Sequence, residues 1–292
     1  MPGRVIARAA TAALALAGAM TAAATAPARA AAPVVEATYT VRAAGLPVME
    51  VEARFDLARP DGYAMDLRTR VRGVGVVAGG GAGESRVVGA WAGDAARPAA
   101  FASEGTWRGN RRSILLEYAR DGEPLVRRLV PPNDADARDP VPPEARRGTV
   151  DGMTAFVQLA RTMARTGRCD GAVATFDGRR RTEMRAETAG WEVLEPSRDA
   201  WAGTALRCGF EGRQTHGFMA AYSGEEHRRP QRGTAWLAPV VAGAPPIPVR
   251  LDMESRWLGT VRATLVRVAE VPSPAVASGR PVAAAGRGQG GE

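Results

Sequence analysis

The sequence predicts a mainly β protein, in which a large curved antiparallel sheet forms a barrel or half-barrel around one amphipathic helix. About a dozen short segments alternate apolar and polar residues with a period of two, as strands with one face in water do. Turn residues separate these segments. One segment has the period of a helix instead.

The first three strands show the clearest pattern. Segments 36–42, 49–57 and 63–72 each place mainly apolar side chains on one face and polar or charged ones on the other. Breaks at Ala44-Gly45 and at Pro60-Asp61-Gly62 indicate the turns of an antiparallel meander. Further strands are expected at 86–91, 99–107, 113–118, 124–130, 172–176, 180–188, 204–210, 235–241 and 247–257, and in a last segment that ends at Val268.

Two segments between strands lack a periodic pattern. Gly73–Gly83 is rich in glycine, but strands are expected on both sides, whereas a phosphate-binding loop needs a helix after it. It is interpreted as a flexible hairpin loop. Segment 131–148 is rich in proline and should be an extended, irregular connection. Because the strand pattern resumes after it, we interpret it as an excursion within one domain.

The helical segment explains why the sheet should curl. Its apolar stripe comprises Met153, Phe156, Val157, Leu159, Ala160, Met163 and Ala164. Thr149 or Asp151 can cap its start, and Gly167 can end it. At about 22 Å it is too short to cover so wide a sheet, so the sheet must curve with the helix on its concave side.

A barrel of this size can hold one small ligand, or its own side chains can fill the interior. Aromatic residues make up 5% of the chain, and many inward positions are Ala or Val, which leaves room. The candidate cavity-lining residues are Tyr39, Met49, Phe55, Met65, Phe156, Leu159, Met163, Leu251 and Trp257.

Residues 1–30 are predicted to be a signal peptide. Arg4 and Arg8 precede an apolar run, and Ala28-Arg29-Ala30 has small residues where a signal peptidase cleaves. The domain is then expected at 31–271, and the segment 272–292, composed mainly of Pro, Ala, Gly and Arg, is expected to be a disordered tail. These features predict a soluble periplasmic protein.

The chain contains two cysteines, Cys169 and Cys208. In an oxidising compartment two cysteines most simply pair, so a disulfide is predicted. No His or Cys lies at close ligand spacing, so no metal site is expected.

The net charge of +8 is carried entirely by arginine, because the chain contains no lysine. Loss of Arg4, Arg8 and Arg29 with the signal peptide lowers the net charge to +5. Arginine binds phosphates and carboxylates, so a basic exported protein can meet anionic lipid headgroups. The alternative explanation is the composition of a GC-rich genome. Nucleic acid is not expected as a partner, because no aromatic residues are interleaved with the basic ones.

Arg179, Arg180 and Arg181 form a candidate anion-binding site beside a predicted tight turn. In the alternative interpretation, Asp177-Gly178 sets the turn and alternate arginines face water.

No catalytic motif is present. Neither His216 nor His227 lies in a metalloprotease or serine-hydrolase motif, and no cofactor motif occurs. A hydrolase that uses two carboxylates has no sequence motif and remains open.

The order of several short motifs resembles the exported bacterial family known as domain of unknown function 3108. The matching segments are 39–55, 89–91, 98–101, 149–151, 167–171 and 176–181, followed by Cys208. The chain departs from the family at Asp151-Gly152-Met153-Thr154, where Asp-Pro-Leu-Ser is more common. The resemblance implies a fold similar to the half-barrels of periplasmic lipoprotein carriers, which bind acyl chains, and it implies no activity.

Three hypotheses for the function follow. The first is a non-enzymatic periplasmic protein that binds a lipid or other hydrophobic ligand in envelope maintenance. The second is an assembly or scaffold module for another envelope protein, which requires an exposed apolar patch or a free sheet edge. The third is a carboxylate-based hydrolase, which requires two acidic side chains in the cavity.

Overall fold

The computed structural model describes residues 33–77, 79–133, 138–197, 199–219, 229–255 and 258–271. Its strands are β1 (Val34–Ala43), β2 (Leu46–Asp56), β3 (Gly62–Val71), β4 (Gly81–Ala92), β5 (Ala95–Trp107), β6 (Asn110–Tyr118), β7 (Pro124–Val130), β8 (Gly171–Phe176), β9 (Arg181–Leu194), β10 (Gly203–His216), β11 (Gln231–Ala238), β12 (Ile247–Ser255) and β13 (Gly259–Val271). Its helices are α1 (Val74–Val77), α2 (Pro143–Arg146) and α3 (Gly152–Thr166).

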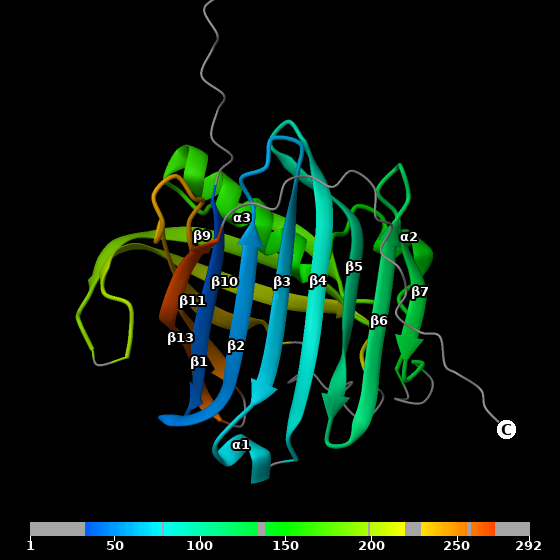
Figure 1. The fold of residues 1–292 in the computed structure, drawn as a ribbon. Coiled ribbons are helices and arrows are strands. Elements are labelled where there is room, and N and C mark those ends of the chain that lie inside the picture. Colours follow the sequence, from blue (N-terminus) through cyan, green and yellow to red (C-terminus); the bar gives the residue numbers. More distant parts are fainter. Residues whose placement is uncertain are drawn as a thin grey trace, which may run out of the picture. The chain divides into compact units, whose positions relative to one another are not determined.

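The described strands form one 13-stranded antiparallel sheet in the order β7-β6-β5-β4-β3-β2-β1-β13-β12-β11-β10-β9-β8. Neighbours in the sheet are consecutive in the chain except for β1 and β13. The sheet therefore consists of two meanders, β1–β7 and β8–β13, joined where the first and last strands pair. Figure 1 shows β9–β11 crossing behind β2–β5. The sheet nearly closes into a barrel, which confirms the predicted fold class.

Described residues of the proline-rich connection, Val141 and Val150, lie in the gap between the edge strands β7 and β8. Val150 makes a parallel bridge to β8, in which its N–H and C=O both hydrogen-bond to backbone groups, at 3.0 and 2.8 Å. Phe176 at the end of β8 packs with Leu116 of β6 and with Val141 of the connection in a buried cluster. The predicted excursion therefore joins the two edges of the sheet.

Two segments contain short helices that the sequence did not predict. The connection 131–148 contains α2, and Gly73–Gly83 contains α1 and the start of β4 instead of an open hairpin loop. Gly73 has a φ of 52°, and a Cβ atom there would lie 2.4 Å from the carbonyl oxygen of Pro47. Glycine therefore lets α1 pack closely against β2. Among the described residues, no helix is long and apolar enough to cross a membrane.

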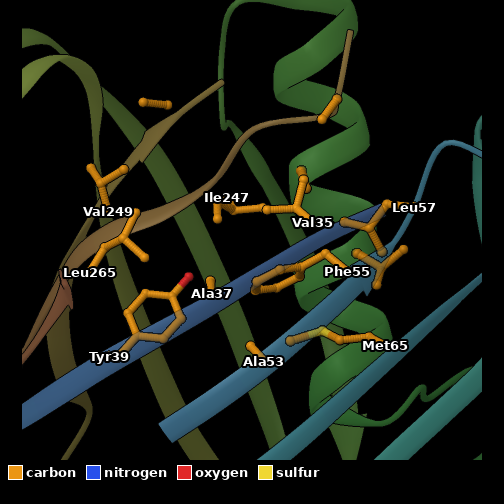
Figure 2. Packing of buried hydrophobic residues seen from close by; sticks show 14 of the residues in the cluster. Val35, Ala37, Tyr39, Ala53, Phe55, Leu57, Met65, Ile247, Val249 and Leu265 are labelled. Atoms are coloured by element: carbon orange, nitrogen blue, oxygen red, sulfur yellow. The ribbon is translucent and has the colours of Figure 1, made fainter. Parts of the chain in front are cut away.

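The inner face of the sheet and α3 share one apolar core. Burial alternates along β1, so its apolar residues face inward as predicted. Met153, Val157 and Ala160 of the helix belong to the same buried cluster as Phe55 of β2 and Met65 of β3. Figure 2 shows these strand residues in front of the helix. The predicted position of the helix on the concave side is therefore confirmed.

A disulfide joins Cys169, which follows α3, to Cys208 in β10, as predicted. Both cysteines are buried. The N–H of Cys169 donates to the hydroxyl of Thr188 in β9 at 2.9 Å, and the N–H of Thr188 donates to Asp170 at 2.9 Å. The end of the helix is thus attached to β9 and β10. Such a disulfide is typical of proteins that fold in an oxidising compartment outside the cytoplasm.

We predict that the double variant Cys169→Ala/Cys208→Ala has a free energy of unfolding lower by about 2–4 kcal/mol, because its unfolded chain is no longer cross-linked. Urea unfolding followed by circular dichroism measures the difference. Since the chain has two cysteines in all, dithiothreitol should lower the wild-type stability to that of the variant and leave the variant unchanged. Equal stability of the oxidised wild type and the variant would contradict the prediction.

Candidate functional site

A buried polar cluster fixes the start of α3. Asp151 is the N-cap, and its carboxylate accepts hydrogen bonds from the backbone N–H and the hydroxyl of Thr154, at 2.9 and 2.7 Å. The hydroxyl of Thr154 lies 3.1 Å from that of Tyr63 in β3. Tyr118 of β6 donates to the Asp151 carboxylate at 3.4 Å. One of the two predicted caps is therefore confirmed, as is Gly167 at the helix end, with a φ of 68°.

Burial raises the pKa of the Asp151 carboxyl, and the hydrogen bonds from Thr154 partly oppose the rise. Burial also raises the pKa values of the Tyr63 and Tyr118 hydroxyls. Asp151 is the one fully buried acidic residue in the described part of the chain. A carboxylate-based hydrolase requires two acidic groups, and the oxygens of this one cap the helix. The cluster is therefore best explained as an anchor for α3.

The turn between β4 and β5 holds the middle of α3. The side chain of Gln158 accepts a hydrogen bond from the N–H of Ala96 at 2.7 Å and donates to the carbonyl of Asp94 at 3.0 Å. The guanidinium of Arg161 lies over the Trp91 ring, 4.0 Å from its centroid. These contacts place the helix near the end of the barrel at which this turn lies.

On β2, β5 and β12, inward-facing side chains become more exposed with distance from α3, whereas on β1 they stay buried up to Ala43. Along β2, Phe55 is 3% exposed, whereas Met49 on the same face is half-buried. Along β12, Val249 is 1% exposed and Met253 is 43% exposed. Trp107, at the far end of β5, is 41% exposed. The helix therefore covers one end of the concave face and leaves part of the other end uncovered. We call the uncovered part the open end.

A shallow cavity of about 190 Å³ lies at the open end. Pockets for drug-sized ligands enclose about 300–1,000 Å³, so this cavity suits one end of an extended chain better than a bulky molecule. Glycine and serine between larger side chains provide the space. The inward-facing residues of its lining include Met49, Thr69, Val71, Gly83, Ser103, Gly105, Trp107, Arg112 and Ile114.

Two larger grooves, of about 1030 and 890 Å³, lie on the outer face of the sheet. One follows β8–β12 and the other follows β1–β5. Charged residues of both signs line them, and many pair across strands, as Arg232 does with Glu211 at 3.0 Å and Arg54 with Glu36 at 2.8 Å. Charged pairs therefore line much of both grooves, and a hydrophobic ligand would have to displace the water around them.

Tyr39 places a polar group inside the apolar core. Its side chain is buried, and its hydroxyl has no hydrogen-bond partner among the described residues. Burial raises the pKa of this hydroxyl, so it is neutral at physiological pH. Figure 2 shows Tyr39 between β1 and the side chain of Leu265. A buried hydroxyl without a partner costs free energy, and it can bind a polar atom of a ligand.

The nine predicted cavity-lining residues fall into different environments. Four are buried in the core, namely Tyr39, Phe55, Met65 and Met163. Four are half-buried, namely Met49, Phe156, Leu159 and Leu251. Trp257 lies outside the described residues. Met49 borders the cavity at the open end, together with residues that the sequence did not single out, such as Val71, Trp107 and Ile114.

The three candidate anion-binding arginines surround the turn between β8 and β9. Arg179 is buried, and its guanidinium donates to a backbone carbonyl just after β7. Arg180 pairs with Asp177 at 2.7 Å, and Arg181 pairs with Glu183 at 2.9 Å. The Asp177 carboxylate also accepts the backbone N–H groups of Arg179 and Arg180, which forms the turn. The three side chains have acceptors in different segments, and a shared anion site stays a prediction.

Nothing in the described residues points to a catalytic centre. His216 is half-buried, and its Nδ1 atom lies 3.1 Å from the hydroxyl oxygen of Thr215. His227 lies outside the described residues. Within the described ranges, no cluster of His, Cys, Asp and Glu is placed to hold a metal ion.

The fold and the open concave face define a class of barrel-like antiparallel proteins with an internal helix. Residues 37–266 match the family described as "Protein of unknown function (DUF3108)", so the chain belongs to this family and the resemblance inferred from its motifs is confirmed. No curated protein matches the sequence.

Solved structures that are similar to this chain include the following two. One is a beta-barrel-like protein of domain of unknown function DUF1849 from Brucella abortus. The sequences are 13% identical, the match covers 84% of this chain and 100% of that chain, and the TM-score is 0.49. The other is a putative exported protein with a YmcC-like fold from Bacteroides fragilis, with 13% identity, 83% and 97% covered, and a TM-score of 0.29.

We predict that Asp151→Ala lowers the free energy of unfolding by about 2–4 kcal/mol, because the helix loses its cap and two hydroxyls lose an acceptor. Asp151→Asn keeps a capping oxygen and should cost less. Urea unfolding of the wild type and both variants measures the two effects. Equal losses for both variants would show that capping is not the main contribution of this residue.

The pH dependence of stability tests the charge of Asp151. Because its folded-state pKa is raised, the native state binds this proton more readily than the unfolded state does. This contribution is complete below the unfolded-state pKa and is lost as the pH rises through the folded-state pKa. Relative to Asp151→Asn, the wild type should therefore gain stability as the pH is lowered from neutral. Urea unfolding at several pH values measures the difference, and a constant difference would contradict the prediction.

Proposed function

We propose that this protein is a non-enzymatic periplasmic binding protein for a lipid or another elongated hydrophobic ligand, and that it acts in envelope maintenance. The observation that carries the proposal is the incomplete cover of the concave face. Apolar side chains that face inward are buried by α3 at one end and exposed at the other.

Exposed apolar walls favour an apolar ligand. Met49, Val71 and Trp107 border the cavity at the open end, and water in contact with them is unfavourable. Each 100 Å² of apolar surface that a ligand covers contributes about 2.5 kcal/mol before the costs of binding. An acyl chain is narrow enough to lie along such a trough.

Tyr39 supports a ligand that carries a polar atom. Its register partner on β2 is Val51, which is half-buried, and the next inward residue along β2 is Met49 at the open end. Tyr39 therefore lies beside the part of β2 in which the inner face becomes exposed. Its hydroxyl can donate to an ester or carboxyl oxygen of a lipid that enters from that side.

The disulfide supports a periplasmic location, together with the predicted signal peptide. Alkylation of the protein recovered from the periplasm of an expressing bacterium should therefore label neither Cys169 nor Cys208.

A pair of neighbouring substitutions tests the ligand proposal. Ser103 faces the cavity, and Ala102 faces the outer groove on the same strand. We predict that Ser103→Phe weakens binding of a fluorescent long-chain fatty acid by about tenfold or more, because the new ring fills the trough. Ala102→Phe adds the same ring outside the barrel and should leave affinity unchanged. Fluorescence titration measures both, and circular dichroism confirms that both variants are folded.

Lipid extraction and native mass spectrometry of the gently purified wild type provide a second measurement. Recovery of protein free of any lipid, together with no fatty-acid binding, would contradict the proposal. Equal loss of binding in both phenylalanine variants would place the ligand outside the concave face.

A second candidate function, an assembly module for another envelope protein, is favoured by the free edge of β9. Pairing with β8 ends at Ala186, the N–H of Thr188 donates to the Asp170 side chain, and within the described sheet no strand lies along the edge of β9 beyond Thr188. Trp191 and Val193 on this stretch are exposed. An extended segment of a partner can add here as a further strand. Loss of a partner with Val193→Asp, while fatty-acid binding persists, would favour this candidate over the first.

A further inference from the structure

We propose that the open end of the barrel is a docking surface for an anionic lipid bilayer. The inference goes beyond the proposed function, because a surface can dock on a membrane whether or not the interior binds a ligand. It rests on two properties of the turns at this end, which are their exposed apolar residues and the sign of their charge.

Exposed apolar residues gather at the open end. The turns β1–β2, β3–β4, β5–β6 and β12–β13 lie at the same end of the sheet, because the strands between them are antiparallel. Figure 1 shows α1 at this lower end, opposite α3. Large apolar side chains are exposed on all four connections, with Val77 of α1 at 92%. These residues are Leu46, Val74, Val76, Val77, Trp107 and Leu258, and we call them the apolar rim.

The same turns carry positive charge. When each turn is taken with two flanking residues on either side, β1–β2, β3–β4 and β5–β6 contain no acidic residue. Their basic residues are Arg42, Arg70, Arg72, Arg108 and Arg111. Arg72 pairs with Glu50, which lies farther along β2, at 3.3 Å. The β12–β13 turn contains Glu254 and Arg256, and the β8–β9 turn at the same end contains Asp177 and three arginines, 179–181. The open end therefore has a clear excess of positive charge.

The opposite end has the reverse composition. The turns β2–β3, β4–β5 and β6–β7, taken with the same flanks, contain the basic residues Arg59 and Arg120. Their acidic residues are Asp56, Asp61, Asp94, Glu117, Asp121 and Glu123. Within the meander β1–β7, the turns at one end are thus positive and the turns at the other end are negative, and the positive turns carry most of the apolar rim.

An anionic bilayer matches both properties of this surface. Valine, leucine and tryptophan insert at the boundary between headgroups and acyl chains, while arginine remains at the phosphates. Each basic residue near such a surface raises the affinity by about fivefold. The open concave face would then point toward the bilayer, the source of an apolar ligand.

Vesicle co-sedimentation tests the proposal with protein recovered from the periplasm of an expressing bacterium. We expect binding to vesicles that contain phosphatidylglycerol and much weaker binding to vesicles of phosphatidylcholine alone. Higher ionic strength should reduce binding, because salt screens exposed charges. Val77→Asp and Arg111→Glu should each lower the affinity for the anionic vesicles by about tenfold or more.

Matched variants elsewhere on the surface serve as controls. Val193→Asp introduces the same charge at another exposed valine, and Arg120→Glu reverses an exposed charge at the opposite end. Both should bind anionic vesicles within about twofold of the wild type. Circular dichroism establishes that all four variants are folded.

Several outcomes would overturn the proposal. They are no wild-type binding to anionic vesicles, equal binding to both vesicle types, or equal losses in the test and control variants. A dimer seen by sedimentation velocity that Val77→Asp dissociates would assign the rim to a second copy of the chain. The fatty-acid titration with Ser103→Phe is independent of these results, so the two proposals can fail separately.

Discussion

The structure depends on a mismatch between the length of the strands and the width of a helix. At about 3.3 Å per residue, strands of 10 to 13 residues, such as β1 and β5, extend about 33–43 Å. Helix α3 packs against several of them, through clusters that include Phe55, Met65 and Val87, and a helix is about 10–12 Å wide. It therefore covers a band of the concave face, and apolar side chains beyond that band must find another cover. The curvature of the sheet provides part of this cover, because it brings the two meanders face to face. The apolar side chains that still lack a cover form the open end.

The barrel nearly closes because side chains fill the gap between β7 and β8, where no backbone pairing joins the two strands. Strands β7 and β8 are the edges of the sheet, and unpaired edges favour aggregation. Here the connection between them occupies the gap, with Val150 pairing with β8 and with Val141 packed between Leu116 and Phe176. The proline-rich composition of this connection fits the role, since proline favours extended backbone without requiring a hydrogen-bond partner for its nitrogen. The same connection leads into the cap of α3, so closure of the seam and placement of the helix are coupled.

Local patterns in the sequence determine which face of each strand is inside, but not how deeply each residue is buried. The period-two alternation correctly placed Met49, Phe55 and Met65 on the inner face. Phe55 and Met65 are buried and Met49 is not, because the helix lies nearer to one end of the barrel. That position is set by long-range contacts, such as those between Asp151 and Tyr118 and between Gln158 and the β4–β5 turn. No local pattern contains them. The helix ends were predictable because capping is local, and the disulfide was predictable because the chain has two cysteines. The turn of α1 was missed because it depends on the contact of Gly73 with Pro47.

The positions of the arginines distinguish two explanations for the basic charge, which are a bias in genome composition and a functional surface. A GC-rich genome explains why arginine replaces lysine, but such a bias acts without regard to position. Across the outer faces, arginine is balanced by carboxylates on neighbouring strands, as in the pairs Arg54–Glu36, Arg86–Asp66 and Arg127–Glu117. Exposed pairs of this kind contribute little to stability, about 0–1 kcal/mol each, so folding alone does not require them. Their effect is to keep the flanks of the barrel nearly neutral, so the excess charge is concentrated in the turns of one end. A uniform bias would place acidic residues in the turns β1–β2, β3–β4 and β5–β6 as often as in the turns β2–β3, β4–β5 and β6–β7, and the sequence shows none in the first three and six in the others.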